Sequence, residues 1–336
     1  MPNVPTHITI GRLQADYYIT PEGRAVLNQP GGSGLYAAIG AAIWSESVGI
    51  SARVGSNFNP DWITRFSVGG LQTKGVIATN SVQEHRNFFA YIADGKVRSR
   101  ADIVGLFTRI GQPIPAILKD YDEHPPLDSE TTFGPLAVRP DDFPAEYFKA
   151  EALHIAPCDF ITHRTLPAAA RSLGIKLITC DPTARYMQPS FKAELGLILA
   201  DLDAVLTNEA KVRNFFRSET DDIWESAAAF GEMSVKFIVI NRGAKGQYVY
   251  ETASDSRWHV PAYPTKVVDA TGGRDAYGGG FMVGIAQTEN VVEAAVRGAI
   301  STSLVIEGND PFYALGAHPR LAEARLNAQR EMVRRI

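Results

Sequence analysis

The sequence predicts an α/β protein in which a mostly parallel sheet is covered by helices on both faces. From residue 151 onward, short apolar runs alternate with segments of helical spacing; the runs are "ALHIAP", "KLITCDP", "DAVLTN" and "VKFIVINRG". Apolar strands that alternate with helices are typical of a parallel sheet buried on both sides. Nearer the amino terminus, "THITIG" and "VGISARVG" read as strands around an alanine-rich helix, "GLYAAIGAAIWS".

The elements between these runs follow from local signals. "DWITRFSVGG" predicts a helix that ends at glycine, and "GVIATN" predicts a strand. "NFFAYIADGKVRSRADI" holds two β-rich runs around Asp94 and Gly95, which predicts a hairpin. Residues 105–148 contain seven prolines and are expected to form an irregular insertion that covers a sheet edge. "GQYVYET" and "RWHVPAYP" predict another β pair.

The carboxy-terminal segment "LAEARLNAQREMVRRI" predicts a last helix rich in arginine. Its cations form either a phosphate-binding face or, more commonly, a solvated face. They are Arg320, Arg325, Arg330, Arg334 and Arg335.

Composition excludes several classes of protein. The 336 residues are 45% apolar and 21% charged, which fits a globular protein of two domains or one large domain with an appendage. A net charge of -4 without basic runs argues against nucleic acid as a partner. No apolar stretch is long enough for a membrane span, and "MPNVPTHITIG" does not resemble a signal peptide, so a cytoplasmic location is expected. Cys158 and Cys180 are expected to be reduced, buried thiols.

The stretch "VVDATGGRDAYGGG", residues 267–280, contains the clearest indications of a functional site in this sequence. We expect "TKVVDA" to be a strand and "DAYGGGFMVGIAQ" a helix, with Gly272, Gly273 and Arg274 in the turn between them. Such a turn directs unpaired N–H groups at one spot, where the helix dipole favours a phosphoryl group. From its position at the first turn alone, Asp275 is expected to act as the N-cap of this helix, a common role of aspartate. The triplet 278–280 costs about 1 kcal/mol per glycine, which predicts close approach of another backbone or a ligand.

This stretch resembles the carboxy-terminal signature of the ribokinase/PfkB family of carbohydrate and nucleoside kinases. "PGGSGLYAAIGAA" is similar to the Gly-Gly signature of that family, and "QADY", "DPTAR", "LTNEA" and "NRGAKGQYV" follow in family order. The resemblance covers nearly all of residues 6–308. It implies one ribokinase-like domain over 1–336, with substrate held between the core and a small β lid made from residues near 12–30 and 84–104.

The resemblance also implies roles for particular residues. Asp275 becomes the base that accepts the proton of the substrate hydroxyl, and main-chain N–H groups of Gly272, Gly273 and Arg274 become the anion hole. The implied substrate-binding residues are Asp16, Gly31, Gly32, Ser33 and Tyr36. The implied nucleotide-binding residues are Asn208, Lys211, Asn241, Gly243, Gly246, Ser301 and Thr302.

The implied activity is ATP-dependent transfer of the γ-phosphoryl group to a hydroxyl of a sugar or sugar-like substrate. Mg²⁺ would be held largely by the nucleotide phosphates and water, with no metal ligand required from the protein, and K⁺ beside Asp269 is a further expectation. A homodimer through the exposed face of the lid is expected in some members of the family and a monomer in others. Which sugar or nucleoside is the substrate stays open.

Two departures from the family pattern add positive charge at the phosphate site. Arg274 stands where the family has a glycine, and Lys211 stands where its N-x-x-E motif has the acid. Three explanations compete: both cations clamp the phosphates and partly replace metal, or they fill the nucleotide site of a non-catalytic binding protein, or they face solvent.

Readings outside the sugar kinases are weaker. A nucleoside kinase is one alternative. "GSGLYA", Gly32 to Ala37, also fits the dinucleotide-binding pattern of NAD-dependent oxidoreductases. However, Pro30 stands where a buried strand should lead into that pattern, and no acid follows the next strand. His154 and His163 match no catalytic or zinc motif and are expected to be structural.

Overall fold

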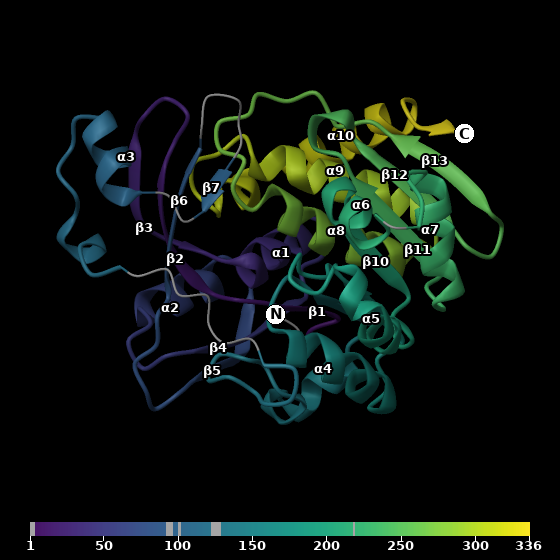
Figure 1. The fold of residues 1–336 in the computed structure, drawn as a ribbon, viewed down its shortest axis with the longest axis horizontal. Coiled ribbons are helices and arrows are strands. Elements are labelled where there is room, and N and C mark those ends of the chain that lie inside the picture. Colours follow the sequence, from purple (N-terminus) through teal and green to yellow (C-terminus); the bar gives the residue numbers. More distant parts are fainter. Residues whose placement is uncertain (1–3, 92–96, 100–101, 122–128, 218) are drawn as a thin grey trace.

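Two sheets organise the chain in this computed structural model, which describes residues 4–91, 97–99, 102–121, 129–217 and 219–336 (Figure 1). The large sheet has the strand order β14-β13-β12-β11-β10-β9-β8-β1-β4-β5, and its strands from β11 to β5 are parallel. Its strands are β1 His7–Ile10, β4 Val48–Val54, β5 Gln72–Ala78, β8 Ala152–Ile155, β9 Leu177–Cys180, β10 Ala204–Asn208, β11 Phe237–Asn241, β12 Gln247–Glu251, β13 Ser256–Val260 and β14 Arg334–Arg335.

The small sheet has the order β3-β2-β6-β7 and lies at the left of Figure 1. Its strands are β2 Gln14–Ile19, β3 Ala25–Gly31, β6 Arg86–Tyr91 and β7 Val97–Ser99. Strands β6 and β7 pair antiparallel, as the hairpin prediction requires, although its expected turn at Asp94 and Gly95 lies outside the described residues.

Helices cover both faces of the large sheet. Alternate side chains of the parallel strands point to opposite faces, so Ile8 and Ile10 of β1 join one core cluster with helices α4 to α7. A second cluster unites α1, α8 and α9 on the other face. The helices are α1 Ser33–Ala42, α2 Pro60–Val68, α3 Ile103–Arg109, α4 Phe160–Ser172, α5 Lys192–Leu199, α6 Glu209–Phe215, α7 Ile223–Glu232, α8 Gly273–Thr288, α9 Val291–Val305 and α10 Pro319–Arg330. The predicted fold class is therefore confirmed.

The glycine triplet lets α8 pack tightly against its neighbours. A Cβ atom on Gly279 would lie 1.8 Å from the carbonyl oxygen of Ala37 in α1, and one on Gly280 would lie 2.2 Å from the Ser301 hydroxyl in α9. Contacts this short leave room for glycine alone. The close backbone approach predicted from "GGG" is what the structure shows.

Two predicted elements differ in the structure. "TKVVDA" is not a strand, because the N–H groups of Val268 and Asp269 both donate to the carbonyl oxygen of Ile306 after α9, at 2.8 and 3.1 Å. Val267 in this segment is 58% exposed, so the apolar run does not enter the sheet. The last helix ends at Arg330, and the chain then pairs with β13 through β14.

Of the two alternatives for the carboxy-terminal arginines, a phosphate-binding face is not supported at Arg325 and Arg330. Arg325 pairs with Glu307 and Arg330 pairs with Glu293, so these guanidinium groups are engaged within the protein.

Residues 135–149 lie along the edge of the large sheet. The hydroxyl of Tyr147 accepts the N–H of Gly75 and donates to the carbonyl of Gln72, which ties this segment to edge strand β5. Arg53 of β4 pairs with Asp142 at 2.5 Å. Among the helices that the structure describes, none has the length and apolar character of a membrane span. Cys158 and Cys180 are both buried, and no disulfide joins them.

Candidate active site

The amino terminus of α8 lies where two cavities meet. Gly272 precedes the helix with φ 73°, and a side chain there would collide with the ring of Tyr36, whose Cγ would lie 2.0 Å from a Cβ atom. No side chain caps the first turn, and the N–H of Gly273 makes a long hydrogen bond of 3.3 Å to the carbonyl oxygen of Ala270. Donors at the start of a helix are a suitable site for an anion. Arg274 and Asp275 are the second and third residues of the helix, one turn before its buried body.

The smaller cavity has a volume of about 280 Å³ and is mainly polar. It brings together residues that the sequence places far apart: Asp16 from β2, Ser33 and Tyr36 from α1, and Asp275 from α8. Gly31 lies behind Asp16, where a Cβ atom would be 1.8 Å from the carboxylate. The lining residues are Arg12, Gln14, Asp16, Gly32, Ser33, Tyr36, Asn87, Phe89, Pro157, Thr271, Gly272, Arg274 and Asp275.

Asp16 is the most buried acid in this cavity, with an exposed fraction of 2%. Its Oδ1 accepts a hydrogen bond of 2.9 Å from the amide of Asn87. Burial raises the pKa of Asp16 to about 7; the Asn87 hydrogen bond opposes that rise, and the charges of Asp269 and Asp275 add to it. Asp16 lines the cavity, and its carboxyl oxygens can accept hydrogen bonds from hydroxyl groups there.

Asp275 is the second acid in the lining of the smaller cavity. Burial raises the pKa of this carboxyl to about 6, while the charges of Arg274 and Lys211 hold it lower than burial alone would. A base whose pKa lies near 6 is ionised at neutral pH and is still basic enough to accept a proton from a reacting hydroxyl.

Asp181, directly after β9, joins the two unusual cations. Its Oδ1 lies 2.6 Å from Nζ of Lys211, and its Oδ2 lies 3.1 Å from Nε of Arg274. Lys211 also donates to the carbonyl of Pro182 and is only 6% exposed. Burial would raise the pKa of Asp181, but the charges of Arg274 and Lys211 hold it below its ordinary value. The explanation that both cations face solvent is therefore wrong for Lys211.

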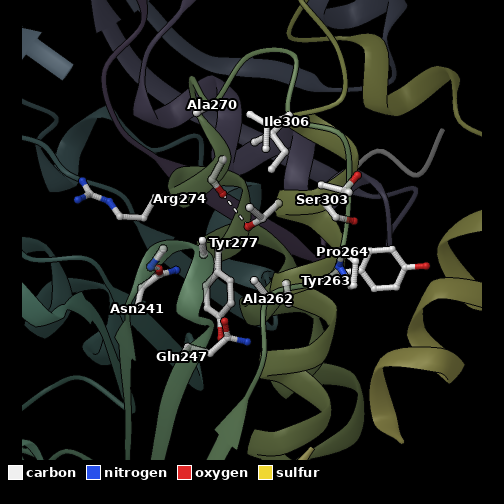
Figure 2. A pocket seen from close by; sticks show the side chains of 17 residues that line it. Asn241, Gln247, Ala262, Tyr263, Pro264, Ala270, Arg274, Tyr277, Ser303 and Ile306 are labelled. Atoms are coloured by element: carbon white, nitrogen blue, oxygen red, sulfur yellow. Dashed lines mark hydrogen bonds between the residues drawn. The ribbon is translucent and has the colours of Figure 1, made fainter. Parts of the chain in front are cut away.

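Arg274 also lines the larger cavity, which has a volume of about 600 Å³ and is drawn in Figure 2. In Figure 2, Arg274 and Asn241 lie at one end and Tyr263 and Pro264 at the other. The wall is mainly apolar and also contains Gly243, Gly273 and Thr302. The hydroxyl of Thr302 donates to the carbonyl of Gly273 at 2.8 Å, which links α9 to the start of α8.

Other residues expected at the nucleotide lie outside this cavity. Ser301 is fully buried between helices, where it donates to the carbonyl of Gly40 and accepts from the indole of Trp44. Neighbouring helix residues point in different directions, so Thr302 faces the cavity while Ser301 faces α1. Gly246 adopts φ 82° in the turn before β12. Asn208 caps α6 by accepting the N–H of Lys211 at 2.9 Å.

The loop before α8 is tied to the small sheet. The hydroxyl of Tyr18 donates to Oδ2 of Asp269, and the N–H of Thr271 donates to Oδ1 at 2.9 Å. The hydroxyls of Tyr91 and Thr271 lie 2.6 Å apart. Both oxygens of Asp269 thus serve as acceptors within the protein, so the carboxylate expected beside K⁺ already has protein partners.

Sequence reasoning missed several residues of the smaller cavity, among them Arg12, Gln14, Asn87, Phe89 and Thr271. Arg12 is held by Asp159, with 2.7 Å between Nη2 and Oδ1. The alternation of "RLQAD" could have found two of them, because Arg12 and Gln14 precede Asp16 at intervals of two. Asn87 and Phe89 reach the site only because β6 pairs with β2, with Asn87 opposite Asp16.

The described residues do not form a site that would hold Mg²⁺ by themselves. They contain no group of three or more histidine, cysteine, aspartate or glutamate side chains placed to bind a metal. Asp181 has one cation on each carboxylate oxygen. Any divalent cation would have to depend on oxygens that a nucleotide and water supply.

The other histidines of interest are structural, as expected. Nδ1 of His154 forms a hydrogen bond of 2.8 Å with the hydroxyl oxygen of Thr179. His163 forms hydrogen bonds with the hydroxyl of Tyr186 and the carbonyl oxygen of Ala156. Burial lowers the pKa of both to about 4. The segment "GSGLYA" follows β3 of the small sheet rather than a core strand, so the structure does not support a dinucleotide-binding turn there.

Comparison with solved structures defines the class as a ribokinase-like α/β fold. A structure described as a putative ribokinase II from E. coli covers 97% of this chain and 100% of its own, with a TM-score of 0.71 and 17% identity. A structure of a putative ribokinase II from E. coli in complex with ATP and Mg²⁺ gives a TM-score of 0.70. A nucleoside kinase from Methanocaldococcus jannaschii covers 97% of this chain and 99% of its own, with a TM-score of 0.67 and 17% identity.

Sequence comparison supplies the family. Residues 135–311, more than half of the chain, match the family described as pfkB family carbohydrate kinase. A cytidine kinase from Thermococcus kodakarensis is 27% identical over 293 residues, which are 87% of this chain and 92% of that protein. A 5-dehydro-2-deoxygluconokinase from Clostridium beijerinckii is 20% identical over 290 residues, 82% of this chain and 78% of the relative. The chain belongs to the pfkB carbohydrate kinase family and is a kinase.

Proposed function

We propose that this kinase transfers the γ-phosphoryl group of ATP to a hydroxyl of a sugar or sugar-like substrate, with Asp275 as the general base. The observation that carries the proposal is the position of α8. Asp275 lines the smaller cavity, and its neighbour Arg274 lines both cavities. An acceptor in one cavity and a polyphosphate in the other can therefore meet at the start of one helix.

The chemistry follows from this placement. The acceptor hydroxyl attacks the γ-phosphorus, its proton passes to the carboxylate of Asp275, and the bond to the β–γ bridging oxygen breaks to release ADP. Main-chain N–H groups at Gly272, Gly273 and Arg274 stabilise the negative charge on the transferred group, where the helix dipole assists them. Phosphoryl transfer depends mainly on such positioning and charge stabilisation.

The acceptor would be oriented by the polar wall of the smaller cavity. Asp16 accepts from hydroxyl groups, while Gln14, Ser33 and Asn87 offer further donors and acceptors. The small sheet would act as a lid, because its Tyr18 and Tyr91 bond to the loop that leads into α8. ATP would lie in the larger cavity, with its phosphates at Arg274 and its base toward Tyr263, and it would bring Mg²⁺ on its own phosphates.

A nucleoside acceptor is the second candidate. The likeness to the cytidine kinase favours it, and so do the aromatic rings of Tyr36 and Phe89 in the cavity wall. Rings of this kind can pack against a base, whereas Asp16 would bind ribose hydroxyls in either case. A panel containing both sugars and nucleosides separates the two candidates by their kcat/KM values.

The test is direct. Purified protein with Mg·ATP and the panel should yield a phosphorylated product by mass spectrometry. Asp275→Asn should lower kcat by about 10² to 10⁴, because it removes the base without changing the shape of the site. Asp221→Asn, at an exposed carboxylate, is the matched control and should be fully active.

The competing proposal is a non-catalytic binding protein, favoured by the contact between Arg274 and Asp181. It predicts ligand-induced thermal stabilisation without turnover. Turnover by the wild type and its loss in Asp275→Asn would exclude this alternative. Equal turnover in both would refute the role of Asp275.

A further inference from the structure

We propose that Lys211 and Arg274 have different roles at the phosphate site. Lys211 holds Asp181 in place, whereas Arg274 binds the polyphosphate directly, so that ATP binding does not depend on a divalent cation. The inference rests on the proposed function, because it places the nucleotide phosphates at the Arg274 end of the larger cavity. It goes further in assigning the two cations different tasks.

Lys211 is placed as a positioning residue. It lines neither cavity, and its ammonium group donates to Asp181 Oδ1 at 2.6 Å and to the carbonyl of Pro182. Pulling a buried ammonium away from its partner leaves two uncompensated charges, which is strongly unfavourable. Lys211 therefore stays on Asp181 when a ligand arrives.

Arg274 is placed as the phosphate ligand. Its side chain is 43% exposed and lines both cavities. Its Nε faces Asp181, while its two Nη groups have no partner among the residues that the structure describes. A guanidinium with two free amino groups can bind a phosphoryl group through two parallel hydrogen bonds.

The shared carboxylate makes Arg274 easy to release. Asp181 carries one negative charge between two cations, so the three groups together retain one positive charge beside the amino terminus of α8. When Arg274 turns to a phosphate, Lys211 still neutralises Asp181. A buried carboxylate with a single partner would oppose that movement, because it would be left unpaired.

The same charges explain why a divalent cation is not needed for binding. Metal-free ATP is highly anionic, and its affinity ordinarily suffers from repulsion unless a cation accompanies it. Here a protein cation stands at the phosphate end of the cavity, and the described residues supply no acidic cluster for a metal. The bound phosphates are therefore neutralised in part by Arg274.

The experiment measures ATP affinity by calorimetry in excess EDTA and in excess Mg²⁺. Wild type should bind metal-free ATP within about tenfold of Mg·ATP. Arg274→Ala should lose about tenfold or more in affinity for metal-free ATP and clearly less for Mg·ATP, because the lost bonds are charge-assisted. Arg242→Ala is the matched control: Arg242 adjoins Asn241 but binds Glu209 and lies outside both cavity linings, so its removal should leave the ratio of the two affinities unchanged.

The variant Lys211→Met tests whether Lys211 keeps Asp181 neutralised and so leaves Arg274 able to bind the nucleotide. Without Lys211, Arg274 becomes the sole partner of Asp181 and is held away from the nucleotide, so the affinity for metal-free ATP should fall more than that for Mg·ATP. A purely structural role of Lys211 would lower both affinities alike.

Three results overturn the inference, and one of them also overturns the proposed function. If wild type binds Mg·ATP but binds metal-free ATP more than about tenfold more weakly, or if Arg274→Ala weakens both forms equally, the inference fails and the proposed function stands. If neither form of ATP binds, the proposed function fails together with it.

Discussion

Asp16 gives the sharpest quantitative prediction, because its burial has opposite effects on activity and stability. The perturbation is Asp16→Asn, a change that keeps the shape of the side chain and an oxygen that can accept from Asn87. Burial raises the pKa of Asp16 from 3.8 to about 7. Between these values the unfolded chain has lost the proton that the folded chain keeps, so the stability of wild type falls as pH rises through this window.

The size of the effect follows from the same two values. Each pH unit between them costs about 1.4 kcal/mol, so ionised Asp16 destabilises the fold by about 4 kcal/mol above pH 7. Asparagine does not titrate and avoids this loss. The stability advantage of Asp16→Asn over wild type should therefore grow by about 3 kcal/mol between pH 5 and pH 8.

The assay is urea unfolding of both proteins at a series of pH values, together with the kinetics of phosphoryl transfer. Asp16→Asn should gain stability as pH rises and should lose acceptor affinity, seen as a raised KM. Asp221→Asn, at an exposed site, should follow wild type throughout. A stability difference that stays constant with pH would refute the reasoning, because it would show that Asp16 titrates alike in the folded and unfolded chains.

Two further predictions concern the base and the packing of α8. Because the pKa of Asp275 is raised to about 6 and the base must be ionised, kcat should fall about tenfold per pH unit below that value and level off above it; a flat profile between pH 5 and pH 7 would contradict the assignment. Gly279→Ala should destabilise the fold by about 3 kcal/mol or more, because its Cβ atom would lie 1.8 Å from the carbonyl oxygen of Ala37. Gly196→Ala, on α5 with no atom within 4 Å of the new methyl group, is the matched control and should be neutral or stabilising by up to about 1 kcal/mol in thermal or urea unfolding.

Local pattern predicted most of the fold because the strands of the large sheet are apolar and the helices between them are periodic. The strand expected at 265–270 fails for a physical reason. Its valines suit a strand, but the N–H groups of Val268 and Asp269 instead donate to the carbonyl oxygen of Ile306 at the end of α9. The carboxy-terminal strand β14 escaped prediction because two residues are too few to show any period.

For the candidate site, the sequence alone predicted the glycine-rich entry to the helix that carries Asp275, because glycine acts there through the local backbone. It also flagged Arg274 and Lys211 as unusual. Only the tertiary structure decided what they contact, since Asp181 lies 30 residues before Lys211 and reaches it through the adjacent ends of β9 and β10. Charge pairs between strand ends depend on the order of strands in the sheet, and that order is a property of packing rather than of any short stretch of sequence.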